Sequence, residues 1–332
     1  MVRQATFRHA VVVVTGASSG VGRATALAFA AEGACLVLAS RGAEALAEVE
    51  RDCRAQGAQV LVVPTDIADP EAVERLAKSA VQRYGRIDIW IEAAAVGIVG
   101  QLGSESVDEI RRLIDTNVLG TTLCARAALT TFRAQGRGTL VLVGSLLSLF
   151  PNPMVPLYSM SKFAVRGLAL NLQRAVAREP RIRVGLVLPG PVDTPFFVRA
   201  ANHSGRTLRA IPPAYAPERV AAKILAVARR PRRQATAGLV SHLGLVAHRI
   251  APATTENVVA WWSAKFVTGP DAAAPGSGSL FDPPADGEVH GGYRRGRTRR
   301  RLGEWLGAPA AALTAPGGAG GRRSPDRPGG TR

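Results

Sequence analysis

The chain has 332 residues, 47% of them hydrophobic and 20% charged, which excludes a wholly disordered protein and is enough for one large core. The three cysteines, Cys35, Cys53 and Cys124, lack paired spacing, so we expect reduced core thiols, no disulfide framework and no metal site. The 42 Lys and Arg residues against 25 Asp and Glu give a net charge of +17, but no nucleic-acid-binding motif accompanies it, and nucleic acid is not an expected partner.

The first predicted elements are a strand, a glycine-rich turn and a helix. Residues 11–14 are four consecutive valines, which is typical of a fully buried strand. Gly16, Gly20 and Gly22 follow in a GxxxGxG spacing, and apolar residues then recur at helical intervals. Because such a turn presents backbone N–H groups and the positive end of a helix, it predicts a binding site for a diphosphate.

Strands and helices then alternate along the first half of the chain. The predicted strands cover residues 34–40, 60–66, 87–91, 138–145 and 183–188, and the predicted helices cover residues 43–56, 69–85, 106–134 and 156–178. This alternation predicts an α/β fold with a doubly wound, mostly parallel sheet. Ligands of such a sheet bind at the carboxyl ends of its strands.

A pair of residues with the chemistry for proton transfer lies on the helix predicted at 156–178. Tyr158 and Lys162 are four residues apart and therefore share one helix face, where the ammonium favours the ionised phenol. Ser145 ends a predicted strand thirteen residues earlier. Asn117 lies in a helix interior close to Gly120, and both residue types are unfavourable there.

Five ordered motifs together resemble the short-chain dehydrogenase/reductase family over roughly residues 8–240. The residues that carry the resemblance are Thr15, Gly16, Gly20, Gly22, Asp66, Asn117, Ser145, Tyr158, Lys162, Pro189, Gly190 and Thr194. The resemblance implies a nicotinamide-dependent oxidoreductase with a Rossmann-type fold that is usually a homo-oligomer.

The resemblance also implies a role for each catalytic residue. Tyr158 would donate a proton to a substrate carbonyl or remove one from an alcohol, and Ser145 would hydrogen-bond the reacting oxygen. Lys162 would lower the pKa of the phenol and bind the nicotinamide ribose. Asn117 would perturb its helix and hold a water molecule that connects Lys162 to solvent.

The end of the second predicted strand indicates which nicotinamide cofactor binds. An acidic residue there would select NAD, whereas Arg41, next to Ser40, can pair with the 2'-phosphate of NADP(H). The residues expected against NADP(H) are Gly16, Ser18, Ser19, Gly20, Val21, Gly22, Ser40, Arg41, Asp66, Ile67, Ala93, Tyr158, Lys162, Pro189, Val192 and Thr194.

One segment departs from the family pattern. Where the family commonly has Asn-Asn-Ala-Gly after the fourth strand, this chain has Glu92, Ala93, Ala94 and Ala95. A carboxylate at Glu92 needs a partner or solvent, because burying it unpaired is costly. The side-chain amides that are missing here would normally hydrogen-bond within the sheet and stabilise the surface against which the cofactor lies.

Residues 193–215 lack clear periodicity and predict a substrate lid without secondary structure of its own. The aromatic and aliphatic side chains of this segment favour a small apolar carbonyl or alcohol substrate. We interpret His203, a lone histidine in this loop, as a solvated residue.

The chain then returns to regular structure, with a helix predicted at 217–230, a short strand at 234–238 and apolar residues at helical spacing over 239–266. The favoured interpretation of 239–266 is two helices packed on the core or at a subunit interface. The alternative is a helix that lies on a membrane surface and makes peripheral contact with it.

The sequence predicts a catalytic domain over residues 1–268 and a Pro-, Gly- and Arg-rich, largely disordered tail over 269–332. Residues 291–332 contain ten Arg against Glu304 and Asp326, a net charge of +8. The first ten residues are too short and charged for a secretory signal peptide, and we expect a cytoplasmic protein.

Two functions from different classes follow from the sequence. The favoured one is an NADP(H)-dependent oxidoreductase that interconverts a ketone or aldehyde and an alcohol. The other is a nucleotide-binding regulatory or scaffold protein with weak turnover, which acts through its basic tail.

Overall fold

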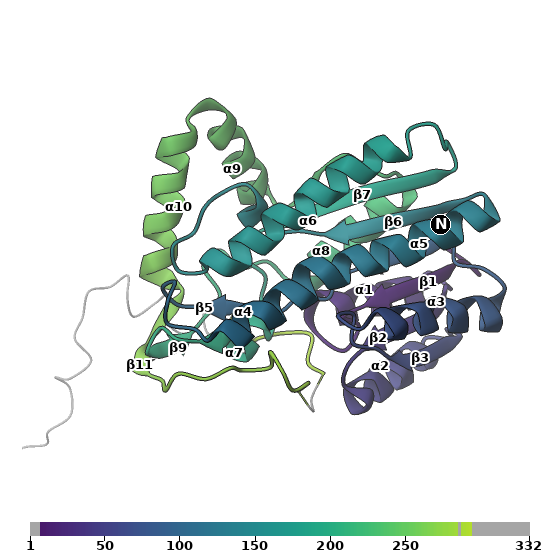
Figure 1. Ribbon diagram of the computed structural model, residues 1–332, viewed down its shortest axis with the longest axis horizontal. Helices are drawn as coiled ribbons and strands as arrows, with labels where there is room; N and C mark the ends of the chain where they lie inside the picture. The colour runs from purple at the N-terminus through teal and green to yellow at the C-terminus, as the bar shows by residue number, and fades with distance from the viewer. Residues whose placement is uncertain (1–6, 285–286, 294–332) are drawn as a thin grey trace, which may run out of the picture. The chain divides into compact units, whose positions relative to one another are not determined.

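The computed structural model describes residues 7–284 and 287–293, and within them seven parallel strands form the main sheet, in the order β10-β7-β6-β4-β1-β2-β3 (Figure 1). The strands are β1 (Val11–Thr15), β2 (Cys35–Ser40), β3 (Val60–Pro64), β4 (Ile89–Glu92), β6 (Gly138–Val143), β7 (Ile182–Pro189) and β10 (Ala235–Ala237). The direction of strand succession reverses between β1 and β4. Ligands of doubly wound sheets bind in the crevice at such a reversal, so the order places a site beyond the carboxyl ends of these two strands.

The valine run of β1 lies at the centre of this sheet. It pairs with β2 on one side and with β4 on the other, and all five of its residues are buried. A parallel strand that is covered on both faces needs apolar side chains on both faces, which is why the run is continuous and not alternating. The predicted fold class is confirmed.

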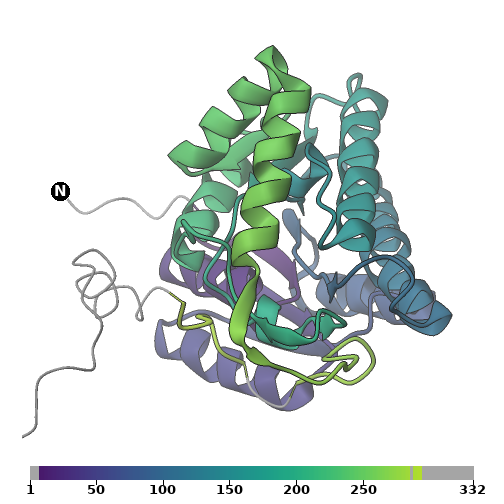
Figure 2. The ribbon, with the colours of Figure 1, turned by 90° about the vertical axis from the view of Figure 1, so that its left-hand side faces the viewer.

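Helices cover both faces of the sheet (Figures 1 and 2). The helices α1 (Gly20–Ala31), α2 (Ala43–Ala55) and α8 (Pro217–Arg229) pack in one hydrophobic cluster with alternate residues of the strands. The helices α3 (Pro70–Tyr84), α5 (Thr121–Gln135) and α6 (Pro156–Ala175) pack in a second cluster on the other face. The side chain of Asp69 accepts a hydrogen bond from Glu71 N at the start of α3, and Gly85 ends that helix in the left-handed conformation.

The helix predicted over residues 106–134 is interrupted. It consists of α4 (Val107–Ile114), a π-helical segment η1 (Asp115–Gly120) and α5, and its capping box joins Ser106 to Glu109. A π-turn inserts one extra residue into the helix, so the side chains after it point in directions that differ from those of a regular α-helix. The expected perturbation at Asn117 is therefore confirmed, and it takes the form of this π-turn.

The segment over residues 193–215 contains short elements that its sequence does not predict. They are α7 (Phe196–Arg199), β8 (Ala201–Asn202) and β9 (Arg206–Leu208). Strand β8 pairs with β5 (Ile98–Val99), and β9 pairs with β11 (Thr268–Ala272). These pairs join segments that are far apart in sequence, so local periodicity does not reveal them.

The apolar region 239–266 folds as two helices, α9 (Leu239–Ile250) and α10 (Pro252–Phe266). One side of this helical pair contacts the rest of the domain, and several large apolar side chains on the other side are exposed, including Leu243, Ile250 and Trp261. Among the described residues, no helix is both long and apolar enough to cross a membrane.

The structured part of the chain continues beyond residue 268, where the sequence predicts a disordered tail. Strand β11 begins at Thr268, and residues 279–284 and 287–293 pack along α2 and the glycine-rich turn. This segment is held by hydrogen bonds to its main-chain groups. Its sequence has no apolar periodicity, which explains why its composition suggested disorder. The basic cluster from Arg294 onward lies outside the described residues.

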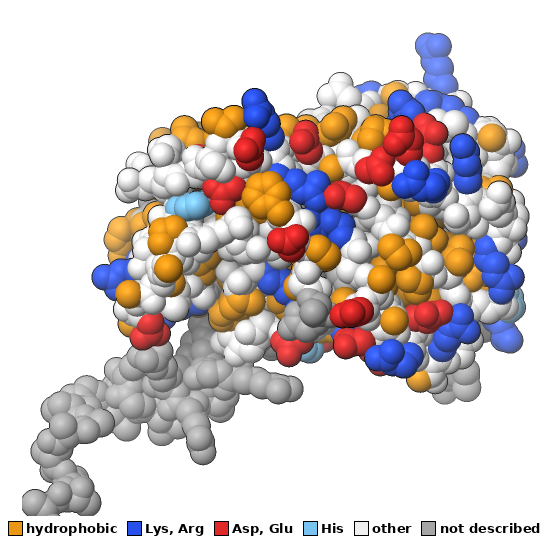
Figure 3. All heavy atoms as spheres, turned by 60° about the horizontal axis from the view of Figure 1, so that its bottom comes forward, with side chains coloured by type: hydrophobic (Ala, Val, Ile, Leu, Met, Phe, Trp, Pro, Cys, Tyr) orange, Lys and Arg blue, Asp and Glu red, His pale blue; other side chains and the backbone are white. Residues whose placement is uncertain are grey.

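Charge on the described surface is mixed. On the face shown in Figure 3, acidic and basic side chains are interspersed. Ion pairs are found in the described part of the chain, such as Arg23 with Asp52 at 2.7 Å and Arg126 with Glu74 at 3.0 Å. Local pairing of this kind neutralises much of the arginine charge, so the net charge of the chain does not translate into one basic patch on this face.

Candidate active site

A cavity of about 580 Å³ lies at the carboxyl ends of the parallel strands. It is bounded by the turns that follow β1, β2, β3, β4, β6 and β7, as the strand order requires. The cavity is lined by all the residues expected against the cofactor, namely Gly16, Ser18, Ser19, Gly20, Val21, Gly22, Ser40, Arg41, Asp66, Ile67, Ala93, Tyr158, Lys162, Pro189, Val192 and Thr194. Of the four expected catalytic residues, Ser145, Tyr158 and Lys162 line it.

The glycine-rich turn brings main chain close to main chain. Gly16 has φ +65°, and a Cβ atom there would lie 2.8 Å from the Cα of Ala94. A Cβ atom on Gly22 would lie 2.0 Å from the carbonyl oxygen of Gly16. Side chains are thus excluded from the turn, and its backbone N–H groups and the first turn of α1 form a cradle that suits a diphosphate.

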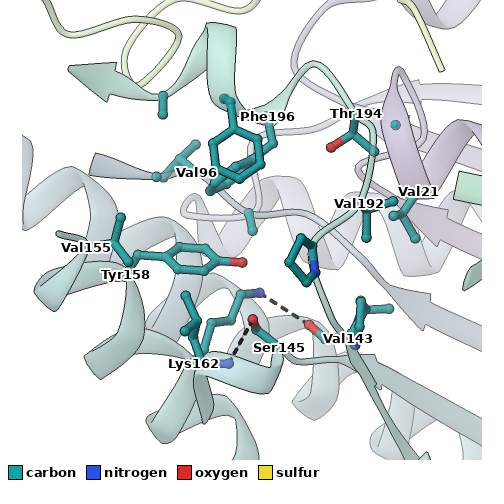
Figure 4. Close-up of a pocket in the computed structure, with 18 of the residues that line it drawn as sticks. Val21, Val96, Val143, Ser145, Val155, Tyr158, Lys162, Val192, Thr194 and Phe196 are labelled. Carbon is teal, nitrogen blue, oxygen red and sulfur yellow. Dashed lines mark hydrogen bonds between the residues drawn. The ribbon is translucent and has the colours of Figure 1, made fainter. Parts of the chain in front are cut away.

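Three polar side chains meet on one wall of the cavity. Figure 4 shows the hydroxyl of Tyr158 pointing into the cavity, with the ammonium of Lys162 and the hydroxyl of Ser145 nearby. Lys162 Nζ donates a hydrogen bond to the carbonyl oxygen of Val143 at 3.2 Å. Ser145 Oγ accepts one from Leu147 N at 3.1 Å, which leaves its own proton available to another acceptor.

The pKa of Tyr158 differs from the expectation. Burial raises it to about 12, and a hydrogen bond with Ser145 lowers it only in part. Lys162, whose Nζ lies 5.7 Å from the centre of the phenol ring, does not reverse the effect of burial. Desolvation of the phenolate thus outweighs the nearby cation, so Tyr158 keeps its proton at neutral pH.

Asn117 lies behind the cavity wall and not on it. Its side chain is fully buried, accepts a hydrogen bond from Val96 N at 2.9 Å and donates one to Val96 O at 2.9 Å. A second donation goes to Ser161 Oγ at 3.0 Å, beside Lys162 on α6. Asn117 therefore ties the segment after β4 to the helix that carries Tyr158 and Lys162.

Glu92, at the end of β4, is also buried and is only 2% exposed. Its Oε2 accepts a hydrogen bond of 2.6 Å from Thr15 Oγ1. Its Oε1 makes no hydrogen bond of ordinary geometry within the described part of the chain, although the thiol of Cys124 is near enough to lower the carboxyl pKa. The carboxylate therefore finds a partner in Thr15, but only for one of its two oxygens.

Glu92 and Lys162 form an electrostatic pair inside the domain. Burial raises the pKa of Glu92 to about 7, and burial lowers the pKa of Lys162 to about 8. Each charge opposes the shift of the other, but desolvation is the larger effect for both. The sequence indicated that Glu92 needs a partner, but it did not indicate that the partner charge would be that of Lys162.

Arg41 occupies the predicted place at the end of β2, but its guanidinium is engaged. It donates hydrogen bonds to three main-chain carbonyl groups, of Ser279, Leu280 and Phe281, at 2.6–2.8 Å. Ser40 Oγ donates to Ser18 Oγ at 2.9 Å, which ties β2 to the glycine-rich turn. No pattern in the sequence predicts this C-terminal contact.

Asp66 also has a protein partner. Its Oδ2 lies 2.6 Å from Nη2 of Arg112, and its Oδ1 accepts a hydrogen bond from Ala68 N. The carboxylate thus shapes the turn after β3 while it lines the cavity.

The remaining wall is apolar. Part of it comes from residues 193–215, where the sequence predicts a substrate lid, and part from segments that local patterns did not assign to the site. Phe196 of α7 packs on the ring of Tyr158 with ring centres 5.1 Å apart. Other large apolar side chains on this wall include Leu147, Phe150, Val155, Phe197, Ile211, Val258, Val259 and Trp262. His203 differs from its predicted solvated state, because it is part-buried and its Nε2 lies 3.1 Å from Glu109 Oε1.

The fold and the site define a nucleotide-binding α/β oxidoreductase. The family model for short chain dehydrogenases matches residues 10–204. The chain belongs to this short-chain dehydrogenase/reductase family, so the resemblance noted in the sequence is confirmed.

Known proteins agree with this membership. The chain is 32% identical to the uncharacterized oxidoreductase YxnA of Bacillus subtilis over 261 residues, which are 75% of this chain and 72% of the relative. It is 33% identical to dehydrogenase/reductase SDR family member 7B of Mus musculus over 225 residues, 67% of this chain and 69% of the relative.

Solved structures give the same result. An alcohol dehydrogenase from Thermococcus sibiricus, complexed with 5-hydroxy-NADP, superposes with a TM-score of 0.60 at 27% identity, over 69% of this chain and 95% of its own. A family member from Burkholderia phymatum in complex with NAD gives 0.66 at 25% identity, over 81% and 99%.

The buried carboxyl group of Glu92 should make stability depend on pH. In the folded protein the pKa of Glu92 is raised from 4.5 to about 7. The stability that the protonated carboxyl group contributes is therefore fully present below pH 4.5 and is lost as the pH rises through about 7. Glu92→Gln removes this loss. We expect the free energy of unfolding of the variant, minus that of the wild type, to increase by on the order of 2 kcal/mol between pH 4.5 and 7.5.

Urea unfolding of both proteins across this range measures the difference. Glu44→Gln, at an exposed carboxylate on α2, is the matched control and should leave the difference nearly constant. A Glu92→Gln difference that is equally flat would show that the carboxyl group is not held protonated by burial.

Proposed function

We propose that this protein is an NADP(H)-dependent oxidoreductase that interconverts a small apolar ketone or aldehyde and the corresponding alcohol. The observation that carries the proposal is the meeting of Ser145, Tyr158 and Lys162 on the wall of a cavity that also contains the glycine-rich turn. Proton donor, oxygen-binding hydroxyl and nucleotide cradle thus share one space.

The residues present suit a dinucleotide. The close main-chain approach at Gly16 and Gly22 leaves room for a diphosphate, and Arg41 at the end of β2 offers a planar cation for a 2'-phosphate. When bound, the nicotinamide supplies or accepts the hydride. Lys162 and Tyr158 are the side chains that would lie against the ribose and the reacting carbon.

The protein's own groups then handle the proton and the developing charge. In reduction, Tyr158 gives its hydroxyl proton to the carbonyl oxygen, and the Ser145 hydroxyl donates a hydrogen bond to the same oxygen. Lys162 stabilises the phenolate that Tyr158 becomes. A phenol of pKa about 12 retains its proton at neutral pH, so Tyr158 is present in the form that can donate a proton.

The apolar wall supports an apolar substrate. Phe196 covers one side of the Tyr158 ring, and the α9–α10 pair contributes Val258, Val259 and Trp262. Burial of apolar surface there would contribute most of the binding free energy, and only the reacting oxygen would need polar partners. The expected homo-oligomer stays a prediction.

Tyr158→Phe should remove the proton donor and little else. We expect kcat for NADPH-linked reduction of a panel of small apolar ketones to fall by about 10²- to 10⁴-fold. NADPH affinity, measured by fluorescence titration, should change by only a few fold. Tyr84→Phe, which removes a phenolic hydroxyl away from the cavity, is the control and should retain activity. Full activity in Tyr158→Phe would favour a nucleotide-binding scaffold over an enzyme.

The cofactor preference depends on Arg41. We expect a higher kcat/KM with NADPH than with NADH, and Arg41→Ala should lower the NADPH value by about 10- to 100-fold, because a charged hydrogen-bonded pair contributes roughly 1.5–3 kcal/mol. The NADH value should not fall, because NADH has no phosphate group for Arg41. Arg51→Ala, at an exposed arginine of α2, controls for loss of charge. A clear preference of the wild type for NADH would contradict the assignment.

A further inference from the structure

A C-terminal segment lies along the part of the cavity expected to receive the adenosine half of the cofactor. We call this segment the strap; it consists of residues 279–284 and 287–293. It follows the yellow-green trace past α2 (Figures 1 and 2), and Ser279, Pro283 and Pro284 line the cavity. The strap therefore shares a space with the predicted nucleotide-binding residues.

The strap occupies hydrogen-bond donors that a nucleotide phosphate would use. Three of its carbonyl oxygens accept from the guanidinium of Arg41 at 2.6–2.8 Å. The carbonyl oxygen of Glu288 accepts from the backbone N–H of Gly20 at 3.0 Å, at the start of α1. Arg23 donates to the carbonyl oxygen of Gly287. These donors belong to the glycine-rich turn, to α1 and to the end of β2.

Both ends of the strap are anchored. Leu280 is 1% exposed and packs in a hydrophobic cluster with Ile98 and Leu113. At the other end, Tyr293 N donates to Asp193 Oδ1 at 2.9 Å, and Gly291 N donates to Asp193 O at 3.2 Å. Each of the two described parts of the strap is thus attached to the domain by specific contacts.

We propose that the strap is an autoinhibitory element that competes with the cofactor for Arg41 and the Gly20 N–H. This inference rests on the proposed function, because it takes NADP(H) as the competing ligand. Residues 287–291 must leave the glycine-rich turn before a diphosphate can reach it.

The competition affects both cofactors. The strap offers neutral carbonyl oxygens to Arg41, whereas a 2'-phosphate is a dianion and forms stronger, charge-assisted hydrogen bonds. NADPH therefore gives Arg41 a new partner after the strap has left, and NADH does not. The free energy needed to displace the strap from the glycine-rich turn is the same for both, so the strap weakens the binding of both.

Glycine positions allow the strap to be loosened in the full-length protein. A Cβ atom on Gly287 would lie 2.6 Å from Ser18 O, and one on Gly291 would lie 2.4 Å from Thr194 O. Gly287→Ala/Gly291→Ala should therefore push the strap away while Leu280 stays buried. Gly276→Ala is the matched control, because a Cβ atom there meets nothing within 4 Å.

Fluorescence titration with NADPH and with NADH is the test. In the double variant we expect the Kd of NADH and the Kd of NADPH each to fall about tenfold, because the strap must leave the glycine-rich turn before either binds, while Gly276→Ala matches the wild type. Equal affinities in all three proteins would overturn the strap proposal and leave the proposed function intact. No binding of either nucleotide to any of them would overturn both.

Hydrogen exchange gives a second measurement on the wild type. NADPH should accelerate exchange of the strap amides, such as those of Gly291 and Tyr293, while it protects the glycine-rich turn. Slower exchange across the strap on NADPH binding would show a lid that closes over the cofactor, and would overturn the competitive role.

Discussion

The parallel pairing of β1 with β4 and of β4 with β6 is the constraint on which the site depends. Because the three strands run in one direction and side by side, their carboxyl ends meet at one edge of the sheet. The glycine-rich turn, Glu92 and Ser145 therefore lie close together although they are widely separated in sequence. Helix α6 packs on one face of the sheet and brings Tyr158 and Lys162 to the cavity at this edge.

The cost of this arrangement is the burial of charge. Lys162 is placed where it can stabilise a phenolate, but the same burial lowers its own pKa and raises that of Tyr158. Glu92 stands where the family commonly has an amide, and its negative charge supports the protonated form of Lys162. In this chain a carboxylate that is hydrogen-bonded to Thr15 thus stabilises the charged form of Lys162.

Patterns in the sequence predict the sheet, the main helices and the three candidate catalytic residues that line the cavity, Ser145, Tyr158 and Lys162. These features depend on short-range periodicity, helix caps such as Asp69 and motif spacing. The strap was missed because its composition has no periodicity and its contacts reach residues such as Arg41, more than 200 positions away. The pKa of Tyr158 was missed for a related reason, because burial is a property of the folded domain and not of the spacing to Lys162.

The most direct test of the proposed oxidoreductase function is to follow the hydride from the cofactor to the product. NADPH carrying two deuterium atoms at C4 of the nicotinamide is incubated with the protein and a small apolar ketone that it reduces, and the alcohol is analysed by mass spectrometry and NMR. Direct hydride transfer predicts one deuterium at the carbinol carbon of each alcohol molecule formed. Oxidation of NADPH without transfer of deuterium to the product would contradict it.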